Sequence, residues 1–241
     1  MKKIPIPIAG LALALAALAN LVTTFNPILL AAFRIISAVI IVLLTFKAII
    51  APKSVAEDLK NPVMLSVAPT YSMALMLLGA YIKTLGQNTL AISIWALGIV
   101  IHGIFIIMYT MRFIVKFDIK KIFPSVFIVY VGIGTAEITA SAFKMIPLGQ
   151  ASFWFAFLSL LILLPIVIYR LVKVKGIQES VSPTFAILAA PASLALAAYM
   201  KSFPEKNLYI VGFLTVLSLV LYTVVIIAMV KLLALKFYPS F

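Results

Sequence analysis

Long apolar runs separated by short basic or polar stretches fill almost the whole chain. The runs are about 20 residues long and lack the alternation of a half-buried strand, so we expect helices that cross a membrane. The predicted fold is an all-α integral membrane protein with eight transmembrane helices in four hairpins. The expected helices are 5–24, 27–50, 62–83, 89–111, 124–144, 150–172, 183–201 and 207–235. The hairpins are 4–50, 62–111, 123–172 and 183–235, within a single transport domain of residues 1–241.

Three of these spans open with a capping residue followed by proline. The pairs are Asn26-Pro27, Asn61-Pro62 and Ser182-Pro183. Proline at the first helical position loses no hydrogen bond, and the residue before it can cap free N–H groups. We therefore expect the second, third and seventh spans to begin at these prolines.

Every second span carries a helix breaker. The breakers are Pro7, Pro69, Gly134 and Pro191, with separations of 62, 65 and 57 residues. Small residues follow each breaker, as in "LSVAPTYSMALMLLGAY" and "AILAAPASLALAAY", whereas the spans between them are mostly bulky. A nearly fixed period of this length indicates that one two-helix unit is repeated.

A helix breaker in a membrane has a physical consequence. Proline frees a backbone carbonyl, which then needs a polar neighbour or a water-filled cavity. Small residues leave space, so we expect the odd spans to lie inside around a conduit and the even spans outside against lipid. The alternative is that small residues simply permit tight helix packing. The candidate pore-lining and helix-kink residues are Pro7, Gly10, Pro69, Thr70, Ser72, Gly132, Gly134, Thr135, Glu137, Thr139, Pro191 and Ser193.

Composition and charge agree with a membrane protein. The chain is 65% hydrophobic and 10% charged, with a mean hydropathy of +1.26, which excludes a soluble domain. The net charge of +13 does not point to nucleic acid, because the basic residues lie at the ends of apolar spans. Fourteen lie on one side of the expected membrane and four on the other, which predicts a multi-pass cell-membrane protein with a cytoplasmic N-terminus. The first span also fits a secretory signal peptide, although its two early prolines favour a span.

Three charged or titratable residues inside the apolar spans are candidates for chemistry. Glu137 is expected near the middle of the membrane, as a protonatable or selectivity-tuning group or as a structural hydrogen-bonding group. An ionised Glu137 would repel anions, so an anion path requires it to be protonated or paired. Arg34 is expected to extend to the interface, with a positive lining of the path as the alternative. His102 is expected to be a packed core residue rather than a proton relay.

Catalytic chemistry finds little support in the sequence. The chain has one histidine and no cysteine, and it lacks the nucleophile-elbow, zinc-protease and phosphate-loop motifs. We therefore expect no enzyme activity, no cofactor and no metal site.

The segments "AILAAPASLALAAY" and "YVGIGTAEITASAF", together with the alternation of spans, resemble the tellurite-resistance/C4-dicarboxylate transporter family, which includes the plant slow anion channels. The resemblance covers essentially the whole chain. It implies odd helices, commonly kinked at proline, around a pore, in a protein that assembles as a homotrimer. Members have ten helices in five hairpins, so this chain departs from the family by one hairpin. Its end, "ALKFYPSF", resembles the approach to a ninth helix, and no residue matches the family's gating phenylalanine.

Two main functions follow from these observations. The first is a channel or facilitator for small anions such as chloride or nitrate, with tellurite and C4-dicarboxylates such as malate implied by the resemblance. The alternative is a proton-coupled dicarboxylate carrier that uses Glu137, and a third reading is a membrane enzyme or sensor. The expected partners are small inorganic or carboxylate anions and the lipid bilayer, without nucleic acid.

Overall fold

The computed structural model describes residues 4–22, 26–174, 176 and 178–234. Some sequence predictions fall outside these described residues, namely those on Lys2, Lys3, Thr24, Phe25, Lys175 and the segment 235–241. Within the described part every regular element is helical and no strand occurs. The chain divides into two compact units, Met1–Ile107 and Met108–Phe241. The expected single transport domain stays a prediction.

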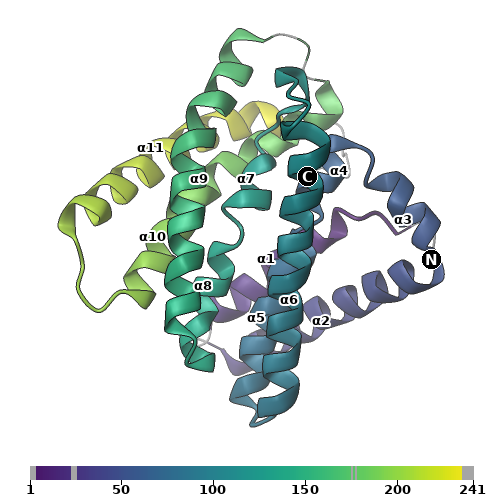
Figure 1. Cartoon of the computed structure of the whole chain (residues 1–241), viewed down its shortest axis with the longest axis vertical. Coiled ribbons are helices and arrows are strands. Elements are labelled where there is room, and N and C mark those ends of the chain that lie inside the picture. Colours follow the sequence, from purple (N-terminus) through teal and green to yellow (C-terminus); the bar gives the residue numbers. More distant parts are fainter. Residues whose placement is uncertain (1–3, 23–25, 175, 177, 235–241) are drawn as a thin grey trace. The chain divides into compact units, whose positions relative to one another are not determined.

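The first unit contains the elements of the first two predicted hairpins (Figure 1). They are α1 (Ile8–Leu21), α2 (Pro27–Ile50), α3 (Pro52–Asp58), α4 (Pro62–Val67), α5 (Thr70–Thr84) and most of α6 (Asn88–Tyr109). α1 packs against α2 and α5, and α2 also contacts the short α3. The unit is thus a bundle of helices without a sheet in its described residues.

The second unit contains the elements of the last two predicted hairpins. They are the π-helical turn η1 (Thr110–Ile114), the 3₁₀ turn η2 (Ile119–Lys121), α7 (Val126–Tyr130), α8 (Gly134–Ala140), the 3₁₀ turn η3 (Ser141–Phe143), α9 (Ile146–Lys173), the 3₁₀ segment η4 (Glu179–Ala189), α10 (Ala190–Ser202) and α11 (Leu208–Leu232). α8 packs against α9 and α10, and α11 contacts both α10 and η4. α10 and α11 form an antiparallel pair joined by one loop in Figure 1.

Seven helical stretches of the described residues are long and apolar enough to cross a membrane. They are Pro27–Ile50, Pro62–Thr84, Asn88–Ile114, Val126–Phe143, Ile146–Lys173, Glu179–Ser202 and Leu208–Leu232. α1 is apolar but has only 14 residues, which is about 21 Å of helix. An all-helical membrane fold is therefore confirmed, whereas the eighth span stays a prediction.

The capping pairs decide two helix starts. The Asn26 side chain accepts hydrogen bonds from the N–H groups of Ile28 and Leu29 at 2.9 and 3.1 Å, and α2 begins at Pro27. Asn61 caps α4 in the same way, and α4 begins at Pro62. Both predicted starts are confirmed.

The predicted start of the seventh span at Pro183 is wrong. The 3₁₀ segment η4 begins four residues earlier, at Glu179, and Pro183 lies within it. The Ser182 hydroxyl donates backwards to the Gln178 carbonyl at 3.3 Å rather than accepting from an N–H group ahead of it. A Ser-Pro pair can therefore lie inside a helical segment when the serine hydroxyl donates to a carbonyl of the preceding turn.

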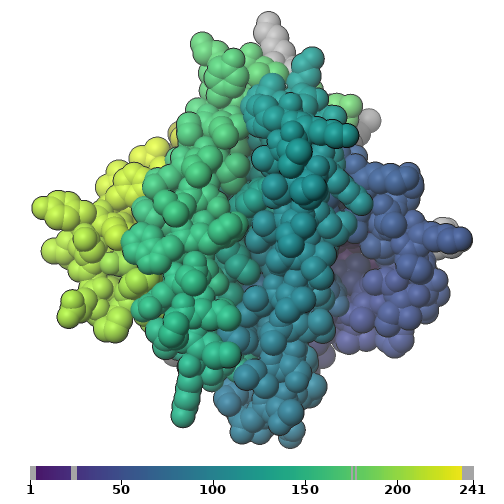
Figure 2. Space-filling model, viewed as in Figure 1, coloured from purple at the N-terminus to yellow at the C-terminus, as the bar shows by residue number. Residues whose placement is uncertain are grey.

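Burial separates two kinds of span. In Pro62–Thr84 and Val126–Phe143, 78% and 72% of the most apolar window is buried, and in Glu179–Ser202 the share is 39%. In the four long, bulky spans the share is between 17% and 28%. α9 illustrates the second kind, since its side chains form a long ridge on the visible face in Figure 2. Exposed apolar side chains such as Phe155, Leu158 and Ile162 are suited to contact with lipid.

Candidate functional site

The regular helix is interrupted at each predicted breaker. A turn at residues 5–7 precedes α1, and Pro69 separates α4 from α5. A turn that includes Gly132 separates α7 from α8, and α8 begins at Gly134. η4 gives way to α10 next to Pro191. Four segments thus change direction or helix type at the breakers, because proline lacks an N–H donor and glycine costs conformational entropy in a helix.

In the first unit two of these segments lie side by side. α1, which follows Pro7, packs against α5, which follows Pro69. Ala9 and Ala12 of α1 share a buried cluster with Ala74 of α5. A Cβ added to Gly10 would meet no described atom within 4 Å. Tight packing therefore explains the alanines of α1 but not Gly10.

In the second unit the other two segments also pack together. α8, which begins at Gly134, contacts α10, which carries Pro191 and Ser193. A Cβ on Gly134 would lie 3.8 Å from the Leu194 side chain, which is an ordinary contact. The structure thus brings the predicted site residues together within each unit, as one pair of breaker helices in each.

The hydroxyl groups near the breakers mostly donate to their own helix. Thr70 donates to the Val67 carbonyl at 2.8 Å, and Ser72 donates to the Pro69 carbonyl at 2.7 Å. Thr139 and Ser193 make the same kind of bond. The Thr135 hydroxyl is buried and has no partner among the described residues. Since a hydroxyl has a single proton, Thr135 is the one of these five that could donate to an anion without releasing its helix.

Glu137 lies in α8 with none of its surface exposed. The Ser202 hydroxyl at the end of α10 donates to its backbone carbonyl at 3.3 Å, and Gly149 in the first turn of α9 faces its Cα. Neither carboxylate oxygen has a hydrogen-bond partner in the described part of the chain. Glu137 therefore lies beside the start of α9 and the end of α10, and its expected depth near the middle of the membrane stays a prediction. A buried carboxylate without a hydrogen-bond partner is costly, and the Lys206 charge is the nearby group that acts favourably on its ionised form.

Neighbouring helices approach each other closely at two glycines, Gly149 and Gly98. A Cβ on Gly149 would lie 2.8 Å from Ala140 Cβ, so α8 and α9 pack too closely for any larger residue there. In the first unit, a Cβ on Gly98 of α6 would lie 3.0 Å from the Ser72 carbonyl oxygen of α5. Small residues thus serve tight packing in these hairpins, as the alternative interpretation expected for such positions.

His102 is joined to the break in α5, which the sequence did not indicate. Its Nδ1 lies 2.9 Å from the Ser72 hydroxyl, and both residues are fully buried. Since that hydroxyl donates to Pro69, it accepts from His102. Gly98 and His102 are four residues apart and therefore lie on one face of α6. This spacing was the feature of the sequence that could have indicated that His102 faces α5. His102 therefore fixes the first turn of α5 from the neighbouring helix.

Two basic residues have partners that sequence reasoning missed. Arg34 donates to the Asn20 side chain at 3.2 Å, and its guanidinium lies 3.9 Å from the Tyr81 ring centroid. Lys47 is buried and forms an ion pair with Asp58 at 2.9 Å, while it also donates to the Ile4 carbonyl. Arg34 thus connects α1, α2 and α5, and Lys47 ties the start of the described chain to α2 and α3.

Kinked apolar spans with small residues at the breaks are typical of a polytopic membrane transport protein. A comparison with known families matches residues 4–241 to the voltage-dependent anion channel family. The chain belongs to this family, which is the one that its sequence resembles. A search of curated proteins found no match. The protein is therefore a membrane protein of the anion channel and transporter class.

Proposed function

We propose that the protein is a channel or facilitator for small anions in the cell membrane, with its N-terminus in the cytoplasm. Chloride- and nitrate-like ions are the first expected substrates, and tellurite and C4-dicarboxylates such as malate fall within the proposed range. The family match over nearly the whole chain is the single observation that carries this proposal. Assembly as a homotrimer is part of the proposal and rests on the family resemblance alone.

The proposed path follows the breaker segments. Their residues are small or carry hydroxyl groups, and Thr135 supplies a buried hydroxyl whose proton has no described acceptor. In the first unit a Cβ added to Gly10 would meet no described atom within 4 Å, so the proposed path has space at this position. Hydroxyl donors suit weak and transient anion binding, since conduction requires that the ion leave as readily as it enters.

Flux measurements in vesicles test this proposal. The purified protein is reconstituted, and chloride, nitrate and malate uptake is followed with and without an imposed proton gradient. Uncoupled transport predicts anion uptake that depends on the anion gradient and membrane potential, with no accumulation driven by the proton gradient. Strict dependence on the proton gradient would contradict it.

Glu137 favours a second candidate, a proton-coupled dicarboxylate carrier. A fully buried carboxylate with no described partner for either oxygen is suited to bind and release a proton. In this case Glu137→Gln abolishes uptake driven by a proton gradient, because the amide cannot carry the proton. Uptake in the variant that still responds fully to the proton gradient would remove Glu137 from the mechanism. Glu179→Gln, at the start of η4, is the matched control, because it removes a carboxylate outside α8.

A further inference from the structure

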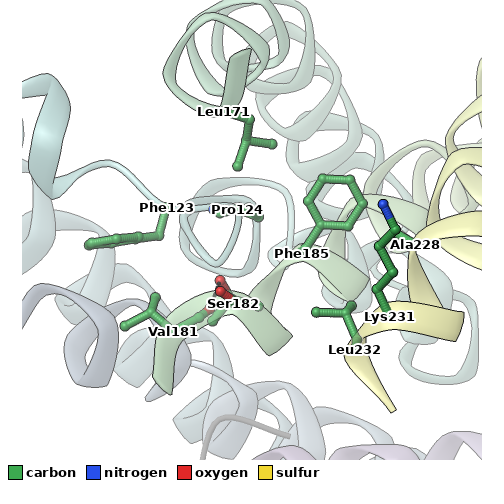
Figure 3. Close-up of a pocket in the computed structure, with 10 residues that line it drawn as sticks. Phe123, Pro124, Leu171, Val181, Ser182, Phe185, Ala228, Lys231 and Leu232 are labelled. Carbon is green, nitrogen blue, oxygen red and sulfur yellow. Dashed lines mark hydrogen bonds between the residues drawn. The ribbon is translucent and has the colours of Figure 1, made fainter. Parts of the chain in front are cut away.

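A cavity of about 270 Å³ lies in the second unit, between the start of α7, the end of α9, η4 and the end of α11. Phe123, Leu171, Phe185 and Ala228 form much of its apolar wall. Figure 3 shows Phe123 on one side of the cavity, with Phe185 and Lys231 on the other. An apolar cavity of about 150 Å³ holds a benzene molecule, so this one is large enough for a stretch of acyl chain.

The cavity lies at the basic end of its helices. Lys231 belongs to the last turn of α11 and lines the cavity, and Arg170 belongs to the last turn of α9. These ends carry the basic residues that predict the cytoplasmic interface. An apolar wall beside a lysine at a membrane interface matches a lipid, which has an apolar chain and a polar headgroup at the same depth.

The described lining of the cavity carries positive charge and no negative charge. None of the described residues that line it is acidic, and Lys231 forms no ion pair with a described residue. Arg170 is buried, with its guanidinium 5.8 Å from the ring centroid of Phe123, a lining residue. One guanidinium N–H donates to the Val174 carbonyl at 2.6 Å, whereas Nε has no partner in the described part. Lys231 in the lining therefore offers positive charge to an anionic group, and Arg170 adds a second positive charge beside Phe123.

Two other cavities of the described chain lack this combination. A cavity of about 270 Å³ in the first unit is lined by Lys47, but that lysine is already paired with Asp58. A cavity of about 350 Å³ beside η1 has no charged residue in its lining. Both could hold an apolar chain, but neither selects for the charge of a headgroup.

We propose that the cavity of the second unit is a binding site for one anionic phospholipid of the leaflet at the basic end. Its acyl chain lies against Phe123, Phe185 and Ala228, and its phosphate pairs with Lys231. Basic pockets between membrane helices on this side bind anionic headgroups in the same manner. A free phosphate ion would gain nothing from the apolar wall, which favours a lipid as the source of the phosphate. The inference is independent of the proposed ion path.

Lipid titration of the purified full-length protein tests the site. Phosphatidylglycerol or phosphatidylcholine is added in detergent, and bound lipid is counted by native mass spectrometry while thermal unfolding is recorded. We expect one phosphatidylglycerol to bind in preference to phosphatidylcholine and to raise the unfolding temperature. Lys231→Gln should weaken this binding by about 5-fold. Lys173→Gln removes the same charge at the same end outside the cavity and should leave it unchanged.

A second variant tests the apolar wall without changing charge. Ala228→Phe fills the cavity, so it should reduce phosphatidylglycerol binding while the protein unfolds normally in phosphatidylcholine. Equal binding of both lipids, or undiminished binding by both Lys231→Gln and Ala228→Phe, would overturn the proposal. Equal stabilisation by glycerol phosphate would show a site for free anions and would also overturn it. A change of oligomeric state in Ala228→Phe, without loss of lipid, would indicate a second copy of the chain as the occupant instead.

Discussion

The hydroxyl groups near the helix breaks differ in whether they donate a hydrogen bond to the backbone. Four of them donate to carbonyls of their own segment, and the proton of Thr135 has no acceptor among the described residues. A back-bonded hydroxyl offers only lone pairs to its surroundings, which suit a cation better than an anion. Among these five hydroxyl groups, Thr135 is therefore the one that we propose as a hydrogen-bond donor to a passing anion.

Replacing Thr135 by valine tests this distinction. Thr135→Val keeps the shape but removes the donor, so we expect single-channel or macroscopic chloride conductance to fall by about 2- to 10-fold, the worth of one hydrogen bond. Thr139→Val is the matched control in the same helix, because the Thr139 hydroxyl already donates to the Thr135 carbonyl. Equal losses in both variants would contradict a special role for the Thr135 donor.

Residue identity alone predicted some of the site and missed other parts. The sequence indicated that Glu137 is buried and that Pro69 and Gly134 interrupt their helices, because a carboxylate or a breaker within an apolar run is visible locally. It could not indicate that Gly149 and Ser202 flank Glu137, since these contacts depend on how α8 packs against α9 and α10. The partners of His102 and Lys47 were missed because they also depend on how one helix packs against another.

Helix hairpins depend on small residues at points of close approach. In the second unit, Gly149 of α9 faces Ala140 and Glu137 of α8. This contact fixes the helix that carries Thr135 against its neighbour. Packing of α8 against α9 would therefore position Thr135 in the proposed path.

Gly149→Ala should destabilise this hairpin. The added Cβ would lie 2.8 Å from Ala140 Cβ, so the helices must separate, and we expect a loss of about 1–3 kcal/mol in the free energy of unfolding. Thermal unfolding in detergent measures the effect. Gly212→Ala in α11 is the matched control, because its Cβ would meet no described atom within 4 Å. It should be neutral or stabilising by up to about 1 kcal/mol through helix propensity, and equal effects of the two variants would count against the packing argument.

Helix boundaries show how far local sequence rules extend. Asn26 and Asn61 cap helices that begin at the next proline, since the hydrogen bonds involved are local. Ser182-Pro183 has the same appearance but lies inside η4, because a 3₁₀ turn begins upstream of it. The pair alone cannot distinguish these cases. What differs is the direction in which the serine hydroxyl hydrogen bonds.

Basic residues govern the proposed orientation of the whole molecule. Lys53 lies in α3 at the basic end, whereas Gln87 lies in the loop between α5 and α6 at the opposite end of the stretch Pro62–Thr84. Both are exposed. The excess of lysine and arginine predicts that the basic end faces the cytoplasm.

Cysteine labelling measures this orientation directly, because the chain has no cysteine of its own. We expect Gln87→Cys to react with a membrane-impermeant maleimide in intact cells. Lys53→Cys should react only after the cells are made permeable. The reverse pattern would invert the proposed topology and move the proposed lipid site to the outer leaflet.

The reversal potential in a planar bilayer tests the central claim most directly. The full-length protein is reconstituted under a chloride gradient at equal pH on both sides, and the voltage of zero current is recorded. An anion channel predicts a reversal potential near the chloride equilibrium potential, which shifts with chloride and not with the cation. A reversal potential near the cation equilibrium potential, or a current that requires both a proton gradient and a dicarboxylate, would contradict the account.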